Sequence, residues 1–152
     1  MIFQMSRSAQ HRKGTCLPEP NPFVGTWRLV SIESSESRLF GENPVGILIY
    51  DASGHVAVQI MRNPRPEFSG VAGFPAAKDV QLAYKGYYAY YGTYAVDTAT
   101  KWVTHYLEGS LRPGDVGKEF TRAYEFKGKD LALTPVNDSQ ARDACLTWER
   151  VG

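Results

Sequence analysis

A tryptophan near the start of the β-rich part of the chain and an arginine at its end constrain the fold most strongly. Trp27 follows Gly25 and Thr26 in the first β-rich segment, and Arg150 ends the last one. If the two strands are neighbours, the guanidinium can stack on the indole face. The first and last strands become neighbours when an antiparallel sheet closes on itself. The pair therefore predicts a closed β-barrel, in which Trp27 and Arg150 serve structural closure rather than ligand binding.

Short β-rich segments separated by turn residues follow one another from Val24 onward. Val, Ile, Thr, Tyr and Trp are frequent in the segments, while Gly, Pro, Asp and Asn separate them. We expect eight strands, at residues 24–33, 45–50, 55–62, 93–97, 102–108, 118–126, 131–134 and 144–150. Eight antiparallel strands close a barrel whose interior either fills with side chains or holds one small ligand. The predicted fold class is all-β, an eight-stranded antiparallel closed β-barrel.

One segment between the third and fourth predicted strands has helical periodicity. Apolar side chains recur at helical spacing over residues 76–91, and Gly92 follows as a candidate C-cap. Five of the nine tyrosines lie in this segment, which gives the expected helix an aromatic face. We expect the helix to flank the barrel wall or to cap one of its openings.

The composition predicts one domain and excludes several classes of partner. A chain of 152 residues, 43% hydrophobic, can bury roughly two thirds of its unfolded surface in a single core. We expect this domain over residues 21–152, after a polar N-terminal arm at residues 1–20. A net charge of +1 without a long basic run disfavours nucleic acid, and no apolar stretch approaches the ~20 residues of a membrane span. We expect a cytoplasmic protein, and a homodimer is left open.

Known catalytic and cofactor motifs are missing from the sequence. It contains no Gly-x-Ser-x-Gly, no phosphate-binding glycine loop and no His-Glu-x-x-His. Cys16 and Cys145 are far apart and fit no zinc or redox spacing. We expect two reduced thiols, with a disulfide from the arm to the last strand as the alternative. Any catalysis would use neither a metal nor another cofactor.

Strand alternation assigns the central side chains to the two faces of the sheet. His105 lies between two aliphatic residues on one face of its strand. Arg122 shares a face with three aromatic residues, so we expect its guanidinium to point into the barrel and to stack or pair there. In the third strand both faces are partly apolar, and we take the face of Gln59 and Met61 as inward.

These assignments predict a small-molecule site inside the barrel. His105, as a proton carrier near pH 7, and Arg122, as a fixed cation, are the candidate catalytic residues. The residues expected to contact the ligand are Gln59, Met61, Tyr50, Tyr94, Leu48, Phe120, Tyr124 and Trp148. A few convergent polar groups in an apolar cavity are typical of such sites. The alternatives are a hydrogen-bonded core histidine and an arginine that pairs with a structural carboxylate.

Several short motifs carry a resemblance to a known family. Gly25-Thr26-Trp27 resembles the Gly-x-Trp opening of the lipocalins, and Arg150 stands where the arginine that packs over that tryptophan is expected. Further matching motifs are Asn43-Pro44-Val45-Gly46, Tyr91-Gly92-Thr93-Tyr94, Glu108-Gly109-Ser110-Leu111 and Leu146-Thr147-Trp148-Glu149-Arg150. From about Pro22 to Arg150, the chain is similar to the small bacterial and fungal lipocalin-like domain proteins. The resemblance implies an eight-stranded calycin-type barrel, and some such proteins encoded beside natural-product pathways are similar to cyclases and isomerases.

The residues and the resemblance together favour a protein that acts on a mostly apolar, oxygenated metabolite, polyketide- or terpenoid-like. Our first hypothesis is a cofactor-free isomerase or cyclase in which Arg122 and His105 polarise a carbonyl or an enolate. The alternative is a non-catalytic lipocalin-type binding or carrier protein. A third hypothesis is a filled barrel, without a cavity of the ~300 Å³ that a drug-sized ligand needs.

Overall fold

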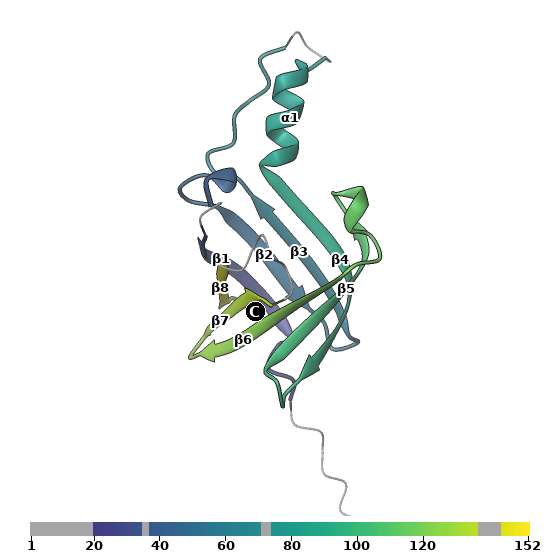
Figure 1. Cartoon of the computed structure of the whole chain (residues 1–152). Coiled ribbons are helices and arrows are strands. Elements are labelled where there is room, and N and C mark those ends of the chain that lie inside the picture. Colours follow the sequence, from purple (N-terminus) through teal and green to yellow (C-terminus); the bar gives the residue numbers. More distant parts are fainter. Residues whose placement is uncertain (1–19, 35–36, 71–73, 137–143) are drawn as a thin grey trace, which may run out of the picture.

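Eight antiparallel strands form a closed barrel in the computed structural model, which describes residues 20–34, 37–70, 74–136 and 144–152 (Figure 1). The strands follow one another around the barrel in chain order, and the last pairs with the first. Their bounds are β1 Gly25–Glu33, β2 Val45–Tyr50, β3 His55–Met61, β4 Tyr87–Asp97, β5 Trp102–Ser110, β6 Glu119–Lys127, β7 Asp130–Pro135 and β8 Cys145–Arg150. The helices are η1 Ser37–Phe40, α1 Ala77–Lys85 and η2 Pro113–Asp115. The predicted fold class is confirmed.

Two predictions concern residues that the structure does not describe. The N-terminal arm, apart from Pro20, lies outside the described residues, and Cys16 lies there with it. Cys145 begins β8 and is half-buried. The arm and the state of the two thiols therefore stay predictions.

The barrel closes at the pair from which closure was predicted. Trp27 and Arg150 are direct partners in the β1–β8 ladder, and the guanidinium carbon lies 4.2 Å from the centroid of the indole ring. Arg150 also donates hydrogen bonds to the backbone carbonyls of Val24, at 2.8 Å, and of Pro22. The buried Trp27 donates from its Nε1 to the carbonyl of Phe23 at 2.9 Å. The indole N–H and two nitrogens of the guanidinium thus each have an acceptor at this closure.

The predicted helix over residues 76–91 is wrong in its second half. α1 ends at Lys85 with Gly86 as its C-cap, and Tyr87–Asp97 form β4. Tyrosine has a high β-propensity, and β4 pairs with β3 on one side and β5 on the other. These non-local pairings outweigh the local helical periodicity. Gly92 is no helix cap, since it lies where β5 approaches so closely that a Cβ would be 1.8 Å from the Tyr106 carbonyl oxygen.

α1 lies between β3 and β4 in the chain, as predicted, but it contributes nothing to the core. None of its nine residues is buried. In Figure 1 it rises from the start of β4 and extends beyond the end of the barrel. It neither flanks the barrel wall nor packs on the interior, so the site has to be built from the strands and their connections.

Because residues 87–97 form a strand and not a helix, the tyrosines that reach the interior differ from those expected. Alternation along β4 turns Tyr88 and Tyr90 inward. Tyr90 is buried, Tyr88 packs against the core, and Tyr91 is 58% exposed on the outer wall. The interior therefore gains two tyrosine side chains that a helix would have held elsewhere.

The predicted faces are confirmed for β5 and β6 and wrong for β3. His105 is buried in β5, and Arg122 lines the interior from β6. In β3, however, the buried residues are Val56, Val58 and Ile60, while Gln59 is exposed on the outer wall and Met61 shares its face.

The pairing of β3 with β2 explains this reversal. Leu48 and Tyr50, both buried, lie directly opposite Val58 and Val56, and directly opposed residues share a face of a sheet. The outer wall is also apolar here, because Ile47 is 38% exposed opposite Gln59. The hydrophobic pattern alone therefore does not distinguish the two faces of β3.

Candidate functional site

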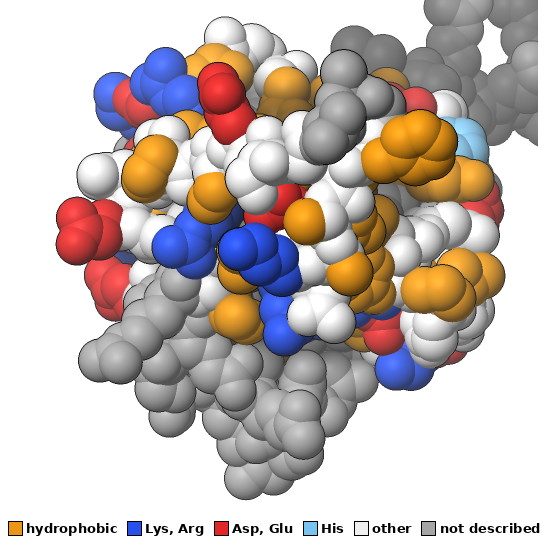
Figure 2. All heavy atoms as spheres, turned by 90° about the horizontal axis from the view of Figure 1, so that it is seen from above, with side chains coloured by type: hydrophobic (Ala, Val, Ile, Leu, Met, Phe, Trp, Pro, Cys, Tyr) orange, Lys and Arg blue, Asp and Glu red, His pale blue; other side chains and the backbone are white. Residues whose placement is uncertain are grey.

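An apolar cavity lies inside the end of the barrel from which α1 extends. Its volume is about 200 Å³. Its hydrophobic lining consists of Ile32, Leu39, Phe40, Leu48, Val58, Ile60, Leu133, Pro135, Ala144, Leu146 and Trp148, and its polar lining of Ser34, Tyr88, Tyr90, His105, Arg112 and Arg122. Figure 2 shows the molecule from this end, with Lys and Arg side chains gathered near the middle of the face among hydrophobic ones.

The volume of the cavity limits the size of a ligand. A cavity of about 150 Å³ holds benzene, whereas drug-sized ligands occupy roughly 300 Å³ or more. The cavity of about 200 Å³ shows that side chains do not fill the barrel. Its volume is nevertheless below the roughly 300 Å³ that a drug-sized ligand needs. It fits a compact molecule built around one ring.

His105 is the polar centre of the interior. Only 1% of its surface is exposed, and both ring nitrogens are engaged: the Tyr50 hydroxyl lies 2.7 Å from Nε2 and the Tyr90 hydroxyl 2.8 Å from Nδ1. Burial, and secondarily the positive charge of Arg122, lowers the pKa of His105 to about 3. His105 is therefore a neutral imidazole at pH 7.

The partners of His105 determine where its ring hydrogen lies. A neutral imidazole has one donor and one acceptor nitrogen. Tyr50 is buried outside the cavity lining, and its hydroxyl hydrogen finds its acceptor at Nε2. We therefore assign the ring hydrogen to Nδ1, which in this tautomer donates to the oxygen of Tyr90. The hydroxyl hydrogen of Tyr90, which does line the cavity, is left to donate into it.

Arg122 is the cation of the interior. Its guanidinium carbon lies 5.1 Å from the ring centroid of Phe120, and its positive charge acts on the hydroxyl of Tyr90. Burial raises the pKa of Tyr90, and Arg122 lowers it in part. No carboxylate of the described residues forms a salt bridge with Arg122. The predicted inward orientation is thus confirmed, and the alternative of a structural carboxylate partner finds no support in this part of the chain.

Trp148 lines the cavity and carries a donor that is unpaired within the described ranges. Its side chain lines the cavity and is 1% exposed. Its Nε1 is buried without a hydrogen-bond acceptor among the residues that the structure describes. An unsatisfied buried N–H costs roughly 1–3 kcal/mol. The tryptophan therefore holds an unused donor at the site.

The rim of the cavity carries a second guanidinium that the sequence analysis missed. Arg112 stacks over the ring of Tyr88, with its guanidinium carbon 4.5 Å from the ring centroid. The Tyr88 hydroxyl donates to Asp115 at 2.8 Å, and Lys118 pairs with the same carboxylate at 3.0 Å. Arg112 lies between two predicted strands, where no motif singled it out, and the assignment of Tyr88 to a helix hid the contact between the two residues.

Comparison with known families agrees with this architecture. The sequence model of the lipocalin-like domain family matches residues 24–151, which is nearly the whole barrel. The chain belongs to the lipocalin-like domain family. The resemblance expected from Gly25-Thr26-Trp27 and Arg150 is thereby confirmed.

Solved structures resemble this lipocalin-like protein in overall fold only. Wild-type fluorescent protein UnaG is 17% identical with a TM-score of 0.40, over 85% of this chain and 97% of that one. The REP1-NXSQ fatty acid transporter is 13% identical with a TM-score of 0.38, over 85% of this chain and 96% of that one. Among curated proteins, no significant match was found.

The other predicted contact residues of the lipocalin-like barrel fall into three groups. Leu48 lines the cavity together with Trp148, and Phe120 packs edge-on against Tyr90 at 5.6 Å between ring centroids. Tyr94 and Tyr124 lie farther from the cavity, around Phe23, at 6.4 and 4.8 Å between ring centroids. Gln59 and Met61 were predicted to face inward and do not. They lie on the outer wall, where Gln59 accepts a hydrogen bond from Tyr87.

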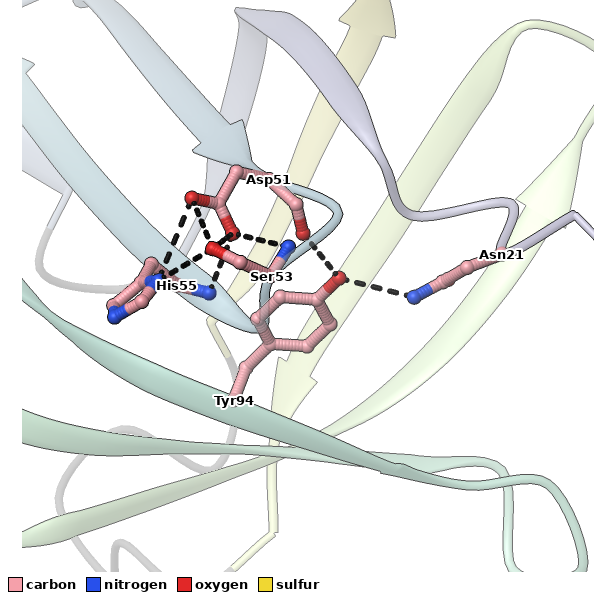
Figure 3. Close-up of polar contacts among 5 residues, drawn as sticks. All are labelled: Asn21, Asp51, Ser53, His55 and Tyr94. Carbon is pink, nitrogen blue, oxygen red and sulfur yellow. Dashed lines mark hydrogen bonds and ion pairs between the residues drawn. The ribbon is translucent and has the colours of Figure 1, made fainter.

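The opposite end of the lipocalin-like barrel holds a Ser-His-Asp cluster (Figure 3). The Ser53 hydroxyl lies 2.8 Å from Nδ1 of His55, and Asp51 lies 3.4 Å from the same nitrogen. Nucleophile activation requires the carboxylate and the hydroxyl on different ring nitrogens. Asp51 also accepts from the backbone N–H groups of Ser53 and His55. The cluster therefore stabilises the β2–β3 turn.

Tyr94 connects this turn to the start of the barrel. Its hydroxyl donates to the backbone oxygen of Asp51 at 3.0 Å and accepts from the side chain of Asn21 at 3.0 Å (Figure 3). Both hydrogen-bonding functions of the hydroxyl are thus used. Tyr94 closes this end of the barrel, and its predicted role as a ligand contact gains no support from this placement.

Two further searches cover only the described ranges. There, no three His, Cys, Asp or Glu side chains gather into a metal-binding cluster. In the same ranges, no helix has the length and the apolar character needed to cross a membrane.

Proposed function

We propose that this lipocalin-like protein binds a compact, mostly apolar, oxygen-bearing metabolite inside its barrel. The observation that carries the proposal is the cavity of about 200 Å³. Most of its lining residues are hydrophobic, and Tyr90, His105 and Arg122 form the polar part of its interior wall. An apolar wall supplies affinity, while a few placed polar groups fix orientation.

The chemistry of His105 favours binding over catalysis. A general base should have a pKa near the working pH, whereas burial holds the pKa of His105 at about 3. Both of its nitrogens are also occupied by tyrosine hydroxyls. A non-catalytic binding or carrier role is therefore the better supported function, and His105 serves in it as a positioning residue for Tyr90.

A cofactor-free isomerase or cyclase of polyketide- or terpenoid-like intermediates is the second candidate. The observation in its favour is the Tyr50–His105–Tyr90 chain, whose hydroxyl and imidazole groups are in hydrogen-bond contact and end at the cavity. In an isomerisation, Tyr90 would give its hydroxyl proton to one position of the ligand and take a proton back from another position, so that the chain returns to its original charge. The fixed charge of Arg122 would then stabilise an enolate.

A pair of identical substitutions on β3 and β2 tests binding. Val58 lines the cavity, whereas Val45 is 42% exposed on the outer wall. A Val58→Phe side chain extends into the cavity, and Val45→Phe adds the same atoms outside. We expect the wild type and Val45→Phe to bind the neutral probe 3-phenylpropan-1-ol by calorimetry, and Val58→Phe to lose it. Equal binding by both variants would place the site elsewhere.

Product analysis separates a carrier from an enzyme. The ligand that copurifies is identified by native mass spectrometry, supplied again to the purified protein, and followed by chromatography. A carrier returns it unchanged. A new isomer that forms with the wild type and not with His105→Gln would instead establish the isomerase or cyclase, provided that the variant still binds the ligand.

A homodimer and a cytoplasmic location stay predictions.

A further inference from the structure

The charged side chains that line the cavity itself, among the described residues, are all cations, and the carboxylate of Asp115 at the rim is bonded to Tyr88 and Lys118. Arg112 and Arg122 are both part of its lining, and no Asp or Glu is among the described residues that line it. The chain as a whole is nearly balanced, with 17 basic and 16 acidic residues. Two cations without a carboxylate in so small a volume are therefore a local feature of the site.

The hydrogen-bonding groups of the cavity are also one-sided. Arg122 has donors and no acceptor, and Trp148 carries an N–H that has no acceptor among the described residues. Tyr90 is already the acceptor for Nδ1 of His105, so its own hydroxyl hydrogen remains. Tyr90 and Arg122 thus offer hydrogen atoms to the cavity, and the lining residue Trp148 carries a buried N–H without an acceptor among the described residues. What they lack is an acceptor.

We propose that the ligand is a compact organic anion, a planar carboxylate or enolate whose oxygen atoms lie against Arg122, with Trp148 and Tyr90 as further donors. This inference rests on the proposed binding function and specifies its ligand class. A guanidinium presents parallel N–H groups that match the two oxygens of a planar oxyanion. The half-buried cation and the buried N–H would both gain a partner when such a ligand is bound.

The hydrophobic part of the ligand is limited by the same cavity. Six ring carbons take a cavity of about 150 Å³, and the site offers about 200 Å³. A single ring with a short acid side chain fits, whereas a long acyl chain does not. At the rim, Arg112 stacks on Tyr88 and places a second positive charge at the entrance, which raises the local concentration of anions.

Three probes with one common hydrophobic group test the inference. They are 3-phenylpropionate, its neutral amide 3-phenylpropionamide and the cation 3-phenylpropylammonium, with hexadecanoate as the long-chain probe. A hydrogen bond to a charged group contributes about 1.5–3 kcal/mol, so the carboxylate should bind about ten- to a hundredfold more tightly than the amide at pH 7. The ammonium and hexadecanoate should bind more weakly than the amide. Calorimetry gives the affinities.

Two arginine variants locate the effect. Arg122→Gln removes the interior charge and should make carboxylate and amide bind equally, whereas Arg122→Lys should keep part of the preference. Arg28→Gln is the matched control, because Arg28 is largely exposed and paired with Glu149, and it should keep the wild-type preference. Thermal unfolding of each variant verifies that it is folded.

The outcomes separate the two proposals. A preference for the carboxylate that disappears in Arg122→Gln alone supports the inference. Equal binding of carboxylate and amide by the wild type would overturn the inference that the ligand is an anion, and would leave the binding function in place. A preference for the carboxylate that survives Arg122→Gln would have the same consequence, because Arg122 would then not be the group that holds the anion. If the wild type binds none of the phenylpropyl probes, nor 3-phenylpropan-1-ol, the binding function itself is wrong.

Discussion

The two ends of the barrel each hold an arginine against an aromatic ring, and only one of them is paired. At the closed end Arg150 stacks on Trp27 and donates to two backbone carbonyls. At the cavity end Arg122 stands beside Phe120 without a carboxylate among the described residues. The same residue type therefore stabilises the fold at one end and remains available to a ligand at the other.

Two buried tryptophans repeat the contrast. Trp27 and Trp148 are each 1% exposed. Trp27 donates its N–H to the Phe23 carbonyl, whereas the N–H of Trp148 has no acceptor in the described part of the chain. Folded proteins pair nearly all buried donors, so an N–H without an acceptor and a cation without a carboxylate, both judged among the described residues, are what supports the proposed site. The predictions below test whether the two ends really differ in this way.

The largest expected effect is the removal of the indole at the closed end. Trp27→Ala should cost about 3–5 kcal/mol of the free energy of unfolding, since a fully buried indole is lost and a cavity is left. Trp102→Ala, at a tryptophan 43% exposed on the outer wall, should cost less than about 1 kcal/mol. Denaturant unfolding measures both. Equal losses would mean that Trp27 has no special role in closure.

The second prediction concerns pH and belongs to the cavity end. The pKa of His105 is about 3 in the folded protein and about 6.5 in an unfolded chain. Below pH 6.5 the unfolded chain binds a proton at this histidine, whereas the folded protein does not do so until about pH 3. The free energy of unfolding therefore has its full value above pH 6.5 and decreases as the pH falls toward 3. The slope approaches about 1.4 kcal/mol per pH unit.

The pH range from 6.5 to 5 isolates this histidine, because carboxyl groups have ordinary pKa values near 4. We expect the free energy of unfolding to fall by about 1–2 kcal/mol over this range. His105→Gln should remove most of that fall, whereas His55→Gln, at the exposed turn, should leave it in place. A wild-type pH profile that is flat over this range would show that His105 is not buried as a neutral group.

The third prediction compares the two arginines directly. Arg150→Met should cost about 1–2 kcal/mol, since a cation–π contact and two hydrogen bonds to backbone carbonyls are lost. In ligand-free protein Arg122→Met should be neutral or stabilising by up to about 1 kcal/mol, because it removes a cation that lacks a carboxylate partner. Opposite signs support the contrast between the two ends. A loss at Arg122 as large as at Arg150 would contradict it.

The closure and the cavity differ in how well the sequence predicted them. Trp27 and Arg150 lie in the first and last of the eight β-rich segments. Their pairing therefore follows once the sheet closes on itself. The inward faces of β5 and β6 were also predicted correctly. On each of these strands, alternation separates a more polar face from a more apolar one. His105 and Arg122 were correctly placed for this reason.

The rest of the site depended on pairings that no local pattern encodes. Tyr90 was missed because its segment has both helical periodicity and high β-propensity, and only pairing with β3 and β5 decides between them. Gln59 was turned the wrong way because the outer wall beside it is apolar as well. The unpaired N–H of Trp148 and the volume of the cavity depend on packing among several strands, which appears only when the barrel is assembled.

The smallest expected effect is spectroscopic and requires no substitution. The chain has three tryptophans, which lie at the closed end (Trp27), on the outer wall (Trp102) and at the cavity (Trp148). If a carboxylate accepts the hydrogen bond that the Trp148 indole now lacks, addition of 3-phenylpropionate should move the Trp148 indole N–H resonance downfield in a ¹H–¹⁵N spectrum. Trp27 already has its acceptor and Trp102 is remote from the cavity, so their resonances should stay in place. If only the Trp27 resonance moved, the ligand would bind at the closed end of the barrel, which would contradict the proposed site.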